Sequence, residues 1–247
     1  MSYQEFKPSP LLQPYIDAYW ASSQATTSSR ILPDGYIDII FNFGQATTTL
    51  PAWGMGISGM MTKFREVSLH PDSELIGIRI HPLHFHRWCP VPLHQLKNIT
   101  VSTKDVLVSW PTALVDQIYQ QKNWPNKIAL IEQQLLTNMN ASNCLRHSLI
   151  SSVCHRIHQS FVSLSLDHIA RAQGIGLRQL ERLFRVNVGV TMKEYQTIIR
   201  FKHTLQDIAS DPKKSLLHVA YDMGYFDHAH LTREINKMAG IPPSQLK

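Results

Sequence analysis

An internal repeat in the last third of the chain constrains the fold more than any other feature of the sequence. The segments IARAQG, residues 169–174, and VAYDMG, residues 219–224, align at an offset of 50. One inserted residue raises the offset to 51 for the pairs that follow: Leu180 with Leu231, Arg182 with Arg233, Gly189 with Gly240, and Val190 with Ile241. A helix-turn-helix needs a small residue where its helices cross and a turn glycine that can adopt positive φ. Two copies in register therefore predict two such motifs.

The helix predicted after the first turn, residues 177–188, has two unlike faces. At about 100° per residue, one apolar arc groups the side chains of Leu177, Leu180, Phe184 and Val188. The opposite side groups Arg178, Arg182 and Arg185, with Glu181 beside them. This face fits a DNA-reading helix, in which Glu181 could accept a hydrogen bond from a cytosine amino group. The alternative is an ordinary solvated face on which Glu181 pairs with Arg178 or Arg185.

The helix predicted after the second turn is less basic. Its inward positions are Leu231, Ile235 and Ala239, and its outward positions are Ala229, Thr232, Arg233, Asn236 and Lys237, with His228 and His230 at its start. Arg, Asn, Thr and His side chains can reach base edges or phosphates, and a small alanine allows close approach to a thymine methyl group. The two histidines fit ordinary surface residues equally well.

The distribution of charge separates the chain into two parts. Residues 1–140 contain ten Lys and Arg against ten Asp and Glu, whereas residues 141–247 contain fourteen against eight, so the whole net charge of +6 lies in the second part. This asymmetry suggests a neutral module joined to one that meets a polyanion. A net charge of this size is also compatible with a well-solvated surface.

A long helix is predicted between the two motifs. Thr191 and Glu194 form a capping box at its start, and Asp211-Pro212 ends it. A helix from Met192 to Ala209 would span about 27 Å. Upstream, the polar segment 137–143 is the best candidate for a linker, which places a domain boundary between residues 140 and 141.

The first 140 residues predict a different structural class. Apolar residues alternate from about Arg30 to His81, with Ile37, Ile39, Phe41 and Phe43 on one face of a strand and Ile76, Ile78 and Ile80 on one face of another. Two helices are predicted at 110–121 and 126–136, broken at Trp124-Pro125. We therefore predict an α+β fold. A small antiparallel β-sheet or barrel domain with helices, residues 1–140, precedes an all-α domain, residues 141–247, with two helix-turn-helix motifs joined by the long helix.

The two motifs resemble those of the AraC/XylS family of bacterial transcription regulators. Residues 165–195 look like the family's first helix-turn-helix and residues 216–247 are similar to its second, including the ending from Gly240 through Pro242 to Lys247. The resemblance implies binding to double-stranded DNA, a partnership with RNA polymerase and no enzymatic activity. It places Arg178, Glu181, Arg182, His228, Ala229, Thr232 and Arg233 at base-facing positions. The full set of predicted DNA-binding residues adds their neighbours Gln179, Arg185, His230, Asn236 and Lys237.

The sequence departs from the family pattern mainly in its second recognition helix. Ile235 and Asn236 stand where the family usually has an aromatic residue and a lysine, and Ala239 stands where it has a second aromatic residue. Met192 replaces a common proline. These departures predict that the second helix packs more loosely and holds DNA less tightly.

The amino-terminal part resembles an uncharacterised sensor-type domain that accompanies such DNA-binding domains. The match rests on residues 31–44 and 76–82, and HPLHF at 81–85 lacks the glycine pair that often follows the proline. The resemblance brings no known ligand, but it allows a small-molecule effector and a homodimer.

Other kinds of site have weaker support. His81, His84, His86, Cys89 and His94 lie close in the sequence, and an extended chain would put His84 and His86 on one face, as metal ligands could lie, but no recognised ligand spacing is present. We expect no metal, no cofactor and no catalytic motif. The three cysteines, Cys89, Cys144 and Cys154, predict buried thiols rather than disulfides.

The preferred function is a sequence-specific transcriptional regulator controlled by a small molecule. With neither a signal peptide nor a membrane-spanning run, we expect it in the cytoplasm. The alternative is a metal- or small-molecule-binding protein whose basic helices contact RNA or a protein partner.

Overall fold

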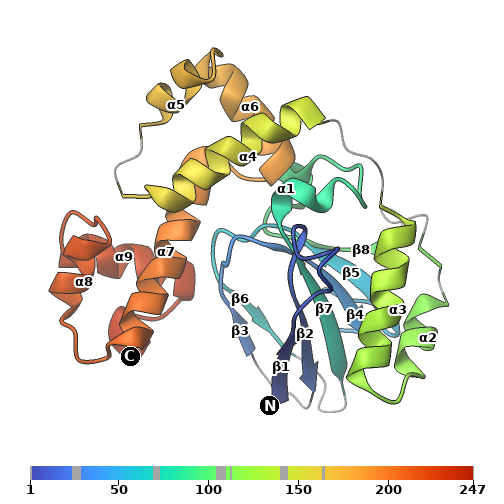
Figure 1. The fold of residues 1–247 in the computed structure, drawn as a ribbon. Coiled ribbons are helices and arrows are strands. Elements are labelled where there is room, and N and C mark those ends of the chain that lie inside the picture. Colours follow the sequence, from blue (N-terminus) through green and yellow to red (C-terminus); the bar gives the residue numbers. More distant parts are fainter. Residues whose placement is uncertain are drawn as a thin grey trace.

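The computed structural model describes residues 2–23, 29–68, 73–103, 110–111, 113–139, 144–162 and 165–246. The proposed boundary between 140 and 141 lies outside these residues. We call the described residues before it the N-terminal module and those after it the C-terminal module. Figure 1 shows an antiparallel sheet with helices in the first and a chain of helices in the second. The predicted α+β fold, a β-sheet domain followed by a helical region, is thereby confirmed.

The N-terminal module is built on a six-stranded antiparallel sheet. Its spatial order is β1 (Ser2–Phe6), β2 (Ile16–Ser23), β7 (Glu74–Ile80), β4 (Ile37–Asn42), β5 (Gly54–Ser58) and β8 (Thr100–Ser102). A separate two-stranded ribbon pairs β3 (Ser29–Ile31) with β6 (Arg65–Val67). Helices therefore cover one face of the sheet, and the ribbon lies beside the other face.

The helix-covered face of the sheet carries the main core of this module. Ile37, Ile39 and Phe41 on β4 and Ile76, Ile78 and Ile80 on β7 are at most 2% exposed, as their alternation predicts. They pack with residues of α1 (Pro82–Phe85), the short 3₁₀ turn η1 (Leu93–Leu96), α2 (Leu114–Tyr119) and α3 (Trp124–Thr137). The break between the two predicted helices lies earlier in the chain than expected. Trp124 and Pro125 begin α3 instead of separating the helices, and Asn123 caps α3 by accepting a hydrogen bond from the N–H of Asn126.

The C-terminal module is helical wherever it is described, apart from its turns. It contains α4 (Cys144–Gln159), α5 (Leu166–Ala172), α6 (Leu177–Val188), α7 (Met192–Ser210), α8 (Leu216–Asp222), α9 (His228–Ala239) and a terminal 3₁₀ turn η3 (Pro243–Gln245). The predicted capping box is present, and α7 is 19 residues long, one more than predicted. In Figure 1, α7 runs between the pair α5–α6 and the pair α8–α9.

The two modules are packed against each other. Met60, from the N-terminal module, is fully buried in the core of the C-terminal module. Lys97 donates to a carboxylate oxygen of Glu194 at 2.5 Å, and the backbone of Leu93 lies against Gly189. The ends of α6 and α7 are therefore held by the N-terminal module.

Two further expectations concern membranes and cysteines. In the described part of the chain, no helix combines the length and apolarity that crossing a membrane requires. Cys89 and Cys154 are buried and free, as predicted, and the side chain of Cys144 lies outside the described part.

Candidate nucleic-acid interface

The repeat in the sequence corresponds to two helix-turn-helix motifs with matching backbone details. Gly174 has a φ of +67° in the turn between α5 and α6, and Gly224 has a φ of +68° in the turn between α8 and α9. Gly189 and Gly240, the second pair of matched glycines, end α6 and α9 in the left-handed region. All four conformations favour glycine because a side chain is strained there.

The first helices of the two motifs are also capped alike. Ser165 accepts a hydrogen bond from the N–H of His168, and Ser215 accepts one from the N–H of His218. Removing such a cap typically destabilises a helix by about 1 kcal/mol. The two serines are also 50 residues apart, so the repeat begins earlier in the chain than the residues from which it was predicted.

The inward faces of the two recognition helices are as predicted. Leu180, Phe184 and Val188 of α6 are fully buried, and Leu231, Ile235 and Ala239 of α9 are fully buried as well. The prediction that Ile235 and Ala239 loosen the packing of α9 is not supported by their burial. Met238, at 1% exposure, adds a further apolar contact that was not predicted.

Within the part of the chain that the structure describes, the outward side chains of α6 make no ion pair. Arg178, Gln179, Glu181, Arg182 and Arg185 are all exposed. Among the described residues none of the three arginines has an ion pair, so Glu181 does not neutralise Arg178 or Arg185. We call Arg178, Arg182 and Arg185 the α6 arginine face. These unpaired guanidinium groups are suited to contacts with phosphates and base edges.

The outward face of α9 is smaller than predicted. His228, Ala229, Arg233, Asn236 and Lys237 are exposed, whereas His230 and Thr232 are half-buried. The N–H of Phe226 donates to Nδ1 of His230 at 3.2 Å, and the ring of His230 packs edge-on against Tyr225. The hydroxyl of Thr232 is buried. His230 therefore helps to shape the turn before α9. Five outward residues of this helix are exposed and can contact a ligand.

Each outward face borders a groove that also contains residues of the N-terminal module. His94 lines a groove of about 540 Å³ with the α6 arginine face. Thr62 lines a groove of about 390 Å³ with Arg233 and Lys237 of α9 and with Lys193 and Thr197 of α7. Lys193 was missed by sequence reasoning, because its nearness to α9 depends on how α7 and α9 cross.

Buried polar contacts attach the second motif to α7. The guanidinium of Arg200 donates to both carboxylate oxygens of Glu234 and lies over the ring of Tyr225, 4.5 Å from its centroid. Burial raises the pKa of Tyr225 to about 12, so its hydroxyl stays protonated beside that of Thr204, 3.1 Å away. No feature of the local sequence pairs Arg200 with Glu234, and these contacts were not predicted.

The histidine-rich segment does not form the extended arrangement in which His84 and His86 would share one face. His84 lies in α1 and His94 in η1, and the ring of His84 packs edge-on against Tyr15. A search of the described residues finds no group of three or more His, Cys, Asp or Glu side chains placed to hold a metal ion.

Comparison with known proteins identifies both modules at the level of families. Residues 169–247 match a family described as a helix-turn-helix domain, and residues 4–102 match a domain of unknown function, DUF6597. The matched helix-turn-helix residues include both turns and both recognition helices. The C-terminal module is an AraC-type helix-turn-helix domain. The predicted resemblance of this module to the AraC/XylS family of transcription regulators is thereby confirmed.

Curated relatives of the AraC-type domain are regulators too. The Msm operon regulatory protein of Streptococcus mutans is 26% identical over 120 residues, which cover 48% of this chain and 43% of the relative. YtdP of Bacillus subtilis, an uncharacterised HTH-type transcriptional regulator, is 25% identical over 140 residues, which cover 54% of this chain and 18% of the relative. The chain thus spans less than half the length of each of these relatives.

One solved structure is similar to part of the chain, and another is similar to most of it. The C-terminal domain of AraT, a response regulator from Geobacillus stearothermophilus, covers 40% of this chain at 19% identity and a TM-score of 0.38. The match to ToxT from Vibrio cholerae covers 92% of this chain and 94% of ToxT, at 11% identity and a TM-score of 0.47.

Proposed function

We propose that the chain is a sequence-specific transcriptional regulator that reads DNA with both recognition helices. The base- and phosphate-contacting residues are Arg178, Gln179, Glu181, Arg182 and Arg185 on α6, and His228, Ala229, Arg233, Asn236 and Lys237 on α9. His230 and Thr232 complete the predicted set from half-buried positions. In this assignment α6 and α9 enter the major groove, where base edges distinguish all four base pairs.

One observation carries this proposal. Two motifs with the same caps, the same left-handed glycines and the same buried positions each present an exposed polar face. On α6 this face carries three arginines without an ion pair among the described residues. A helix whose polar face only meets solvent gives no reason for a second motif with the same construction about 50 residues later.

The connecting helix supports simultaneous binding by both motifs. Its 19 residues span about 28 Å, which is close to the ~34 Å repeat of B-form DNA. One chain should therefore contact two successive major grooves on one face of the duplex. We also propose RNA polymerase as its partner at the promoter, and a homodimer as an assembly that the family resemblance allows.

Selection of bound fragments from a genomic library, followed by footprinting, tests the proposal. We expect one preferred duplex sequence to outcompete random DNA in moderate salt, and a monomeric chain to protect about two turns of it. Equal binding to all polyanions would favour the alternative of a general RNA- or protein-binding surface. Protection of one groove alone would contradict the role of α9.

We further propose that a small molecule bound to the N-terminal module controls this activity. The sheet and the β3–β6 ribbon enclose a pocket of about 360 Å³, which is large enough for a small ligand. Residues of the same module line both grooves beside the recognition helices. Since DNA would have to enter those grooves, a shift of this module would change access to both helices.

A further inference from the structure

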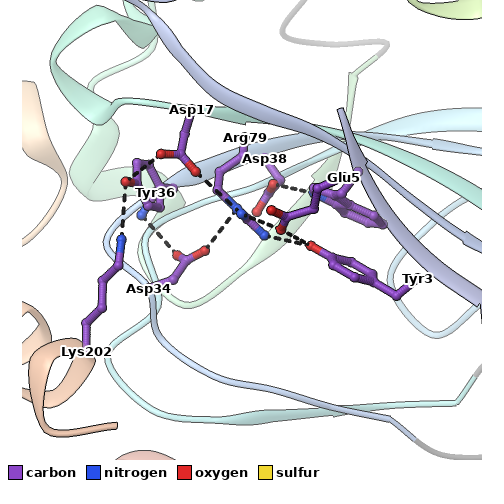
Figure 2. Close-up of polar contacts among 9 residues, drawn as sticks. Tyr3, Glu5, Asp17, Asp34, Tyr36, Asp38, Arg79 and Lys202 are labelled. Atoms are coloured by element: carbon purple, nitrogen blue, oxygen red, sulfur yellow. Dashed lines mark hydrogen bonds and ion pairs between the residues drawn. The ribbon is translucent and has the colours of Figure 1, made fainter. Parts of the chain in front are cut away.

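The ligand pocket lies on the face of the sheet opposite the helices. Its floor comes from β2, β4, β5 and β7, and its rim comes from the ribbon and the loop after β3. Figure 2 shows the polar end of this region, where side chains from several strands meet around Arg79 of β7. In the described part of the chain, the polar residues that line the pocket include Asp34, Asp38, Arg30 and Arg79.

The two terminal nitrogens of Arg79 donate hydrogen bonds to protein groups, whereas its buried Nε has no hydrogen-bond partner among the described residues. Nη1 donates to Glu5 at 2.9 Å and to Asp17 at 3.4 Å, and Nη2 donates to the hydroxyl of Tyr3 at 2.9 Å. Nε lies 3.4 Å from a carboxylate oxygen of Asp34. The guanidinium therefore links these segments, and the three carboxyl groups that surround it oppose the approach of an anionic ligand.

Asp38 differs from Arg79 because its carboxyl group keeps an oxygen for a ligand. Oδ1 accepts a hydrogen bond from Nε1 of Trp20 at 2.8 Å. Among the described residues, no donor reaches Oδ2 within hydrogen-bonding distance. A carboxylate can accept several hydrogen bonds, and a partly buried one is stabilised by a donor that brings positive charge.

Tyr3, Ser22, Ser29 and Ser58 also line the pocket, and the rest of its lining is apolar. Ile40, Val67 and Leu75 form a small cluster against which Trp20 packs. The indole of Trp20 lies across Gly77 so closely that a Cβ on this residue would come within 1.9 Å of the ring. Glycine at this position therefore lets the ring lie flat over the sheet, where it forms a wall next to Asp38.

The charges around the polar end are not balanced. Four carboxyl groups, those of Glu5, Asp17, Asp34 and Asp38, lie around two cations, Arg79 and Lys202. The other cation that lines the pocket, Arg30, is paired with Glu66 at 2.8 Å. The excess of carboxyl groups favours a cationic ligand over an anionic one.

We propose that this pocket binds a small molecule in which an apolar group carries a protonated amine. The ammonium group would donate to Oδ2 of Asp38, and the apolar group would lie against Trp20, Ile40 and Leu75. This inference rests on the proposed function, since it names the chemical class of the effector and its site.

The state of Asp38 agrees with this assignment. Burial, followed by the nearby negative charge of Asp34, raises the pKa of Asp38 to about 7, although Trp20 and Arg79 act to lower it. The protein groups around Asp38 therefore disfavour its carboxylate form. A bound ammonium ion would restore it.

Calorimetry of the full chain without DNA tests the assignment with three matched probes at pH 8. The probes are 2-phenylethylammonium, the neutral 2-phenylethanol and the anion 3-phenylpropanoate. We expect the ammonium probe to bind about tenfold or more tightly than the alcohol, because a hydrogen bond to a charged group is worth about 1.5–3 kcal/mol. The anion should not bind measurably.

Two variants locate the binding site. Asp38→Asn should weaken the ammonium probe about tenfold or more and leave the alcohol unchanged. Asp116→Asn makes the same substitution at an exposed residue of α2 that does not line the pocket, and it should alter neither affinity. The comparison of the three probes on the unmodified chain needs no variant, so it remains decisive if Asp38→Asn fails to fold.

The outcomes separate this inference from the proposed function. Equal or tighter binding of the alcohol or the anion, or ammonium binding that survives Asp38→Asn in a folded chain, would overturn the ligand class. Neither result affects the footprint of the chain on its selected DNA. Conversely, loss of the footprint would leave the calorimetric result for the pocket intact.

Discussion

Arg200 of α7 and Glu234 of α9 form a two-pronged ion pair across the second motif. Nη2 of Arg200 lies 2.9 Å from Oε1 and 2.7 Å from Oε2 of Glu234, and the two side chains are 16% and 14% exposed. Such planar pairing fixes orientation as well as distance. The direction in which α9 presents its outward face is therefore set from the connecting helix.

Replacing Arg200 with alanine should loosen this attachment. We expect Arg200→Ala to lower the free energy of unfolding by about 3 kcal/mol, because Glu234 would lose its cation in a mostly buried position. Chemical denaturation measures the change. The matched control is Arg178→Ala, the same substitution at an exposed residue of α6 without an ion pair, which should change stability by no more than about 0.5 kcal/mol.

The same variant has a second readout on DNA. Protection by Arg200→Ala should weaken in the half of the site that α9 contacts and persist in the half that α6 contacts. A uniform loss over the whole site in a folded variant would mean that the pair does not act locally on α9.

Arg182 and Arg233 are equivalent in the repeat, but their surroundings differ. On α6 Arg178 and Arg185 flank Arg182, whereas on α9 the uncharged Ala229 and Asn236 flank Arg233. Each phosphate contact adds close to one unit to the slope of log affinity against log salt. We therefore expect Arg182→Ala to weaken total binding more than Arg233→Ala, with each relaxing base preference by about 1–3 kcal/mol in its own half of the site.

Fluorescence anisotropy on duplexes with single base-pair changes, repeated over a range of salt, measures both effects. Lys122→Ala removes one positive charge from an exposed loop of the N-terminal module and serves as the control. If Arg182→Ala and Arg233→Ala both leave affinity and preference unchanged, the α6 arginine face is an ordinary solvated surface.

The parts of the fold that sequence could predict depend on contacts close in the chain. Gly174 and Gly224 were predicted from the turn that each must make, and both adopt the expected left-handed conformation. Thr191 and Glu194 are three residues apart, so their capping box follows from local geometry. Likewise, the alternating isoleucines of β4 and β7 needed only a period of two.

The parts that sequence missed depend on residues far apart. β1 and β2 were not predicted, since β2 is buried on both faces in places and does not alternate cleanly between apolar and polar residues. The contacts of Arg79 join residues 3, 5, 17 and 34 to residue 79. No spacing rule connects such positions, so the polar residues that line the pocket could not be predicted. His230 was predicted as a DNA-binding residue at the start of its helix, and its half-buried position instead comes from local contacts with Tyr225 and Phe226 that the turn before α9 creates.

Acid should weaken the contact between the modules at Glu194. Partial burial acts to raise the pKa of this carboxyl group, but hydrogen bonds from Lys97 and from the backbone N–H of Thr191 outweigh it and hold the pKa below its ordinary value. Because the folded-state pKa is depressed, the stabilisation is present above the unfolded pKa, near ~4.3, and is lost as the pH falls through the folded value.

Comparing the unmodified chain with Glu194→Gln over pH tests this linkage. The difference in unfolding free energy between the two should be constant from pH 6 to 8 and should shrink below about pH 4.5. Asp116→Asn, at an exposed residue of α2, provides a control with the same loss of charge. A difference that grows on acidification would contradict the assigned direction of the pKa shift.

Tyr36 joins the ligand pocket to the DNA-binding domain, and its hydroxyl provides a test of coupling. Its N–H donates to Asp34, which faces Arg79, while its hydroxyl donates to Asp17 at 2.9 Å and accepts from Lys202 of α7 at 3.2 Å. Tyr36→Phe keeps the ring, over which Lys202 lies, but removes the hydroxyl. We therefore expect unchanged binding of 2-phenylethylammonium and a loss of stability of about 1 kcal/mol.

The decisive quantity is the ratio of DNA affinities measured with and without this probe. In the unmodified chain we expect a ratio different from one, because a ligand that favours one arrangement of the modules must change DNA affinity by the same coupling free energy. In Tyr36→Phe the ratio should move toward one, since the hydroxyl no longer links Asp17 to Lys202. Tyr119→Phe removes an exposed hydroxyl that has no partner among the described residues and should leave the ratio as it was. An unaltered ratio in Tyr36→Phe, with probe binding intact, would show that the pocket communicates with α7 by another route, such as the contact of Gly35 with Ile199.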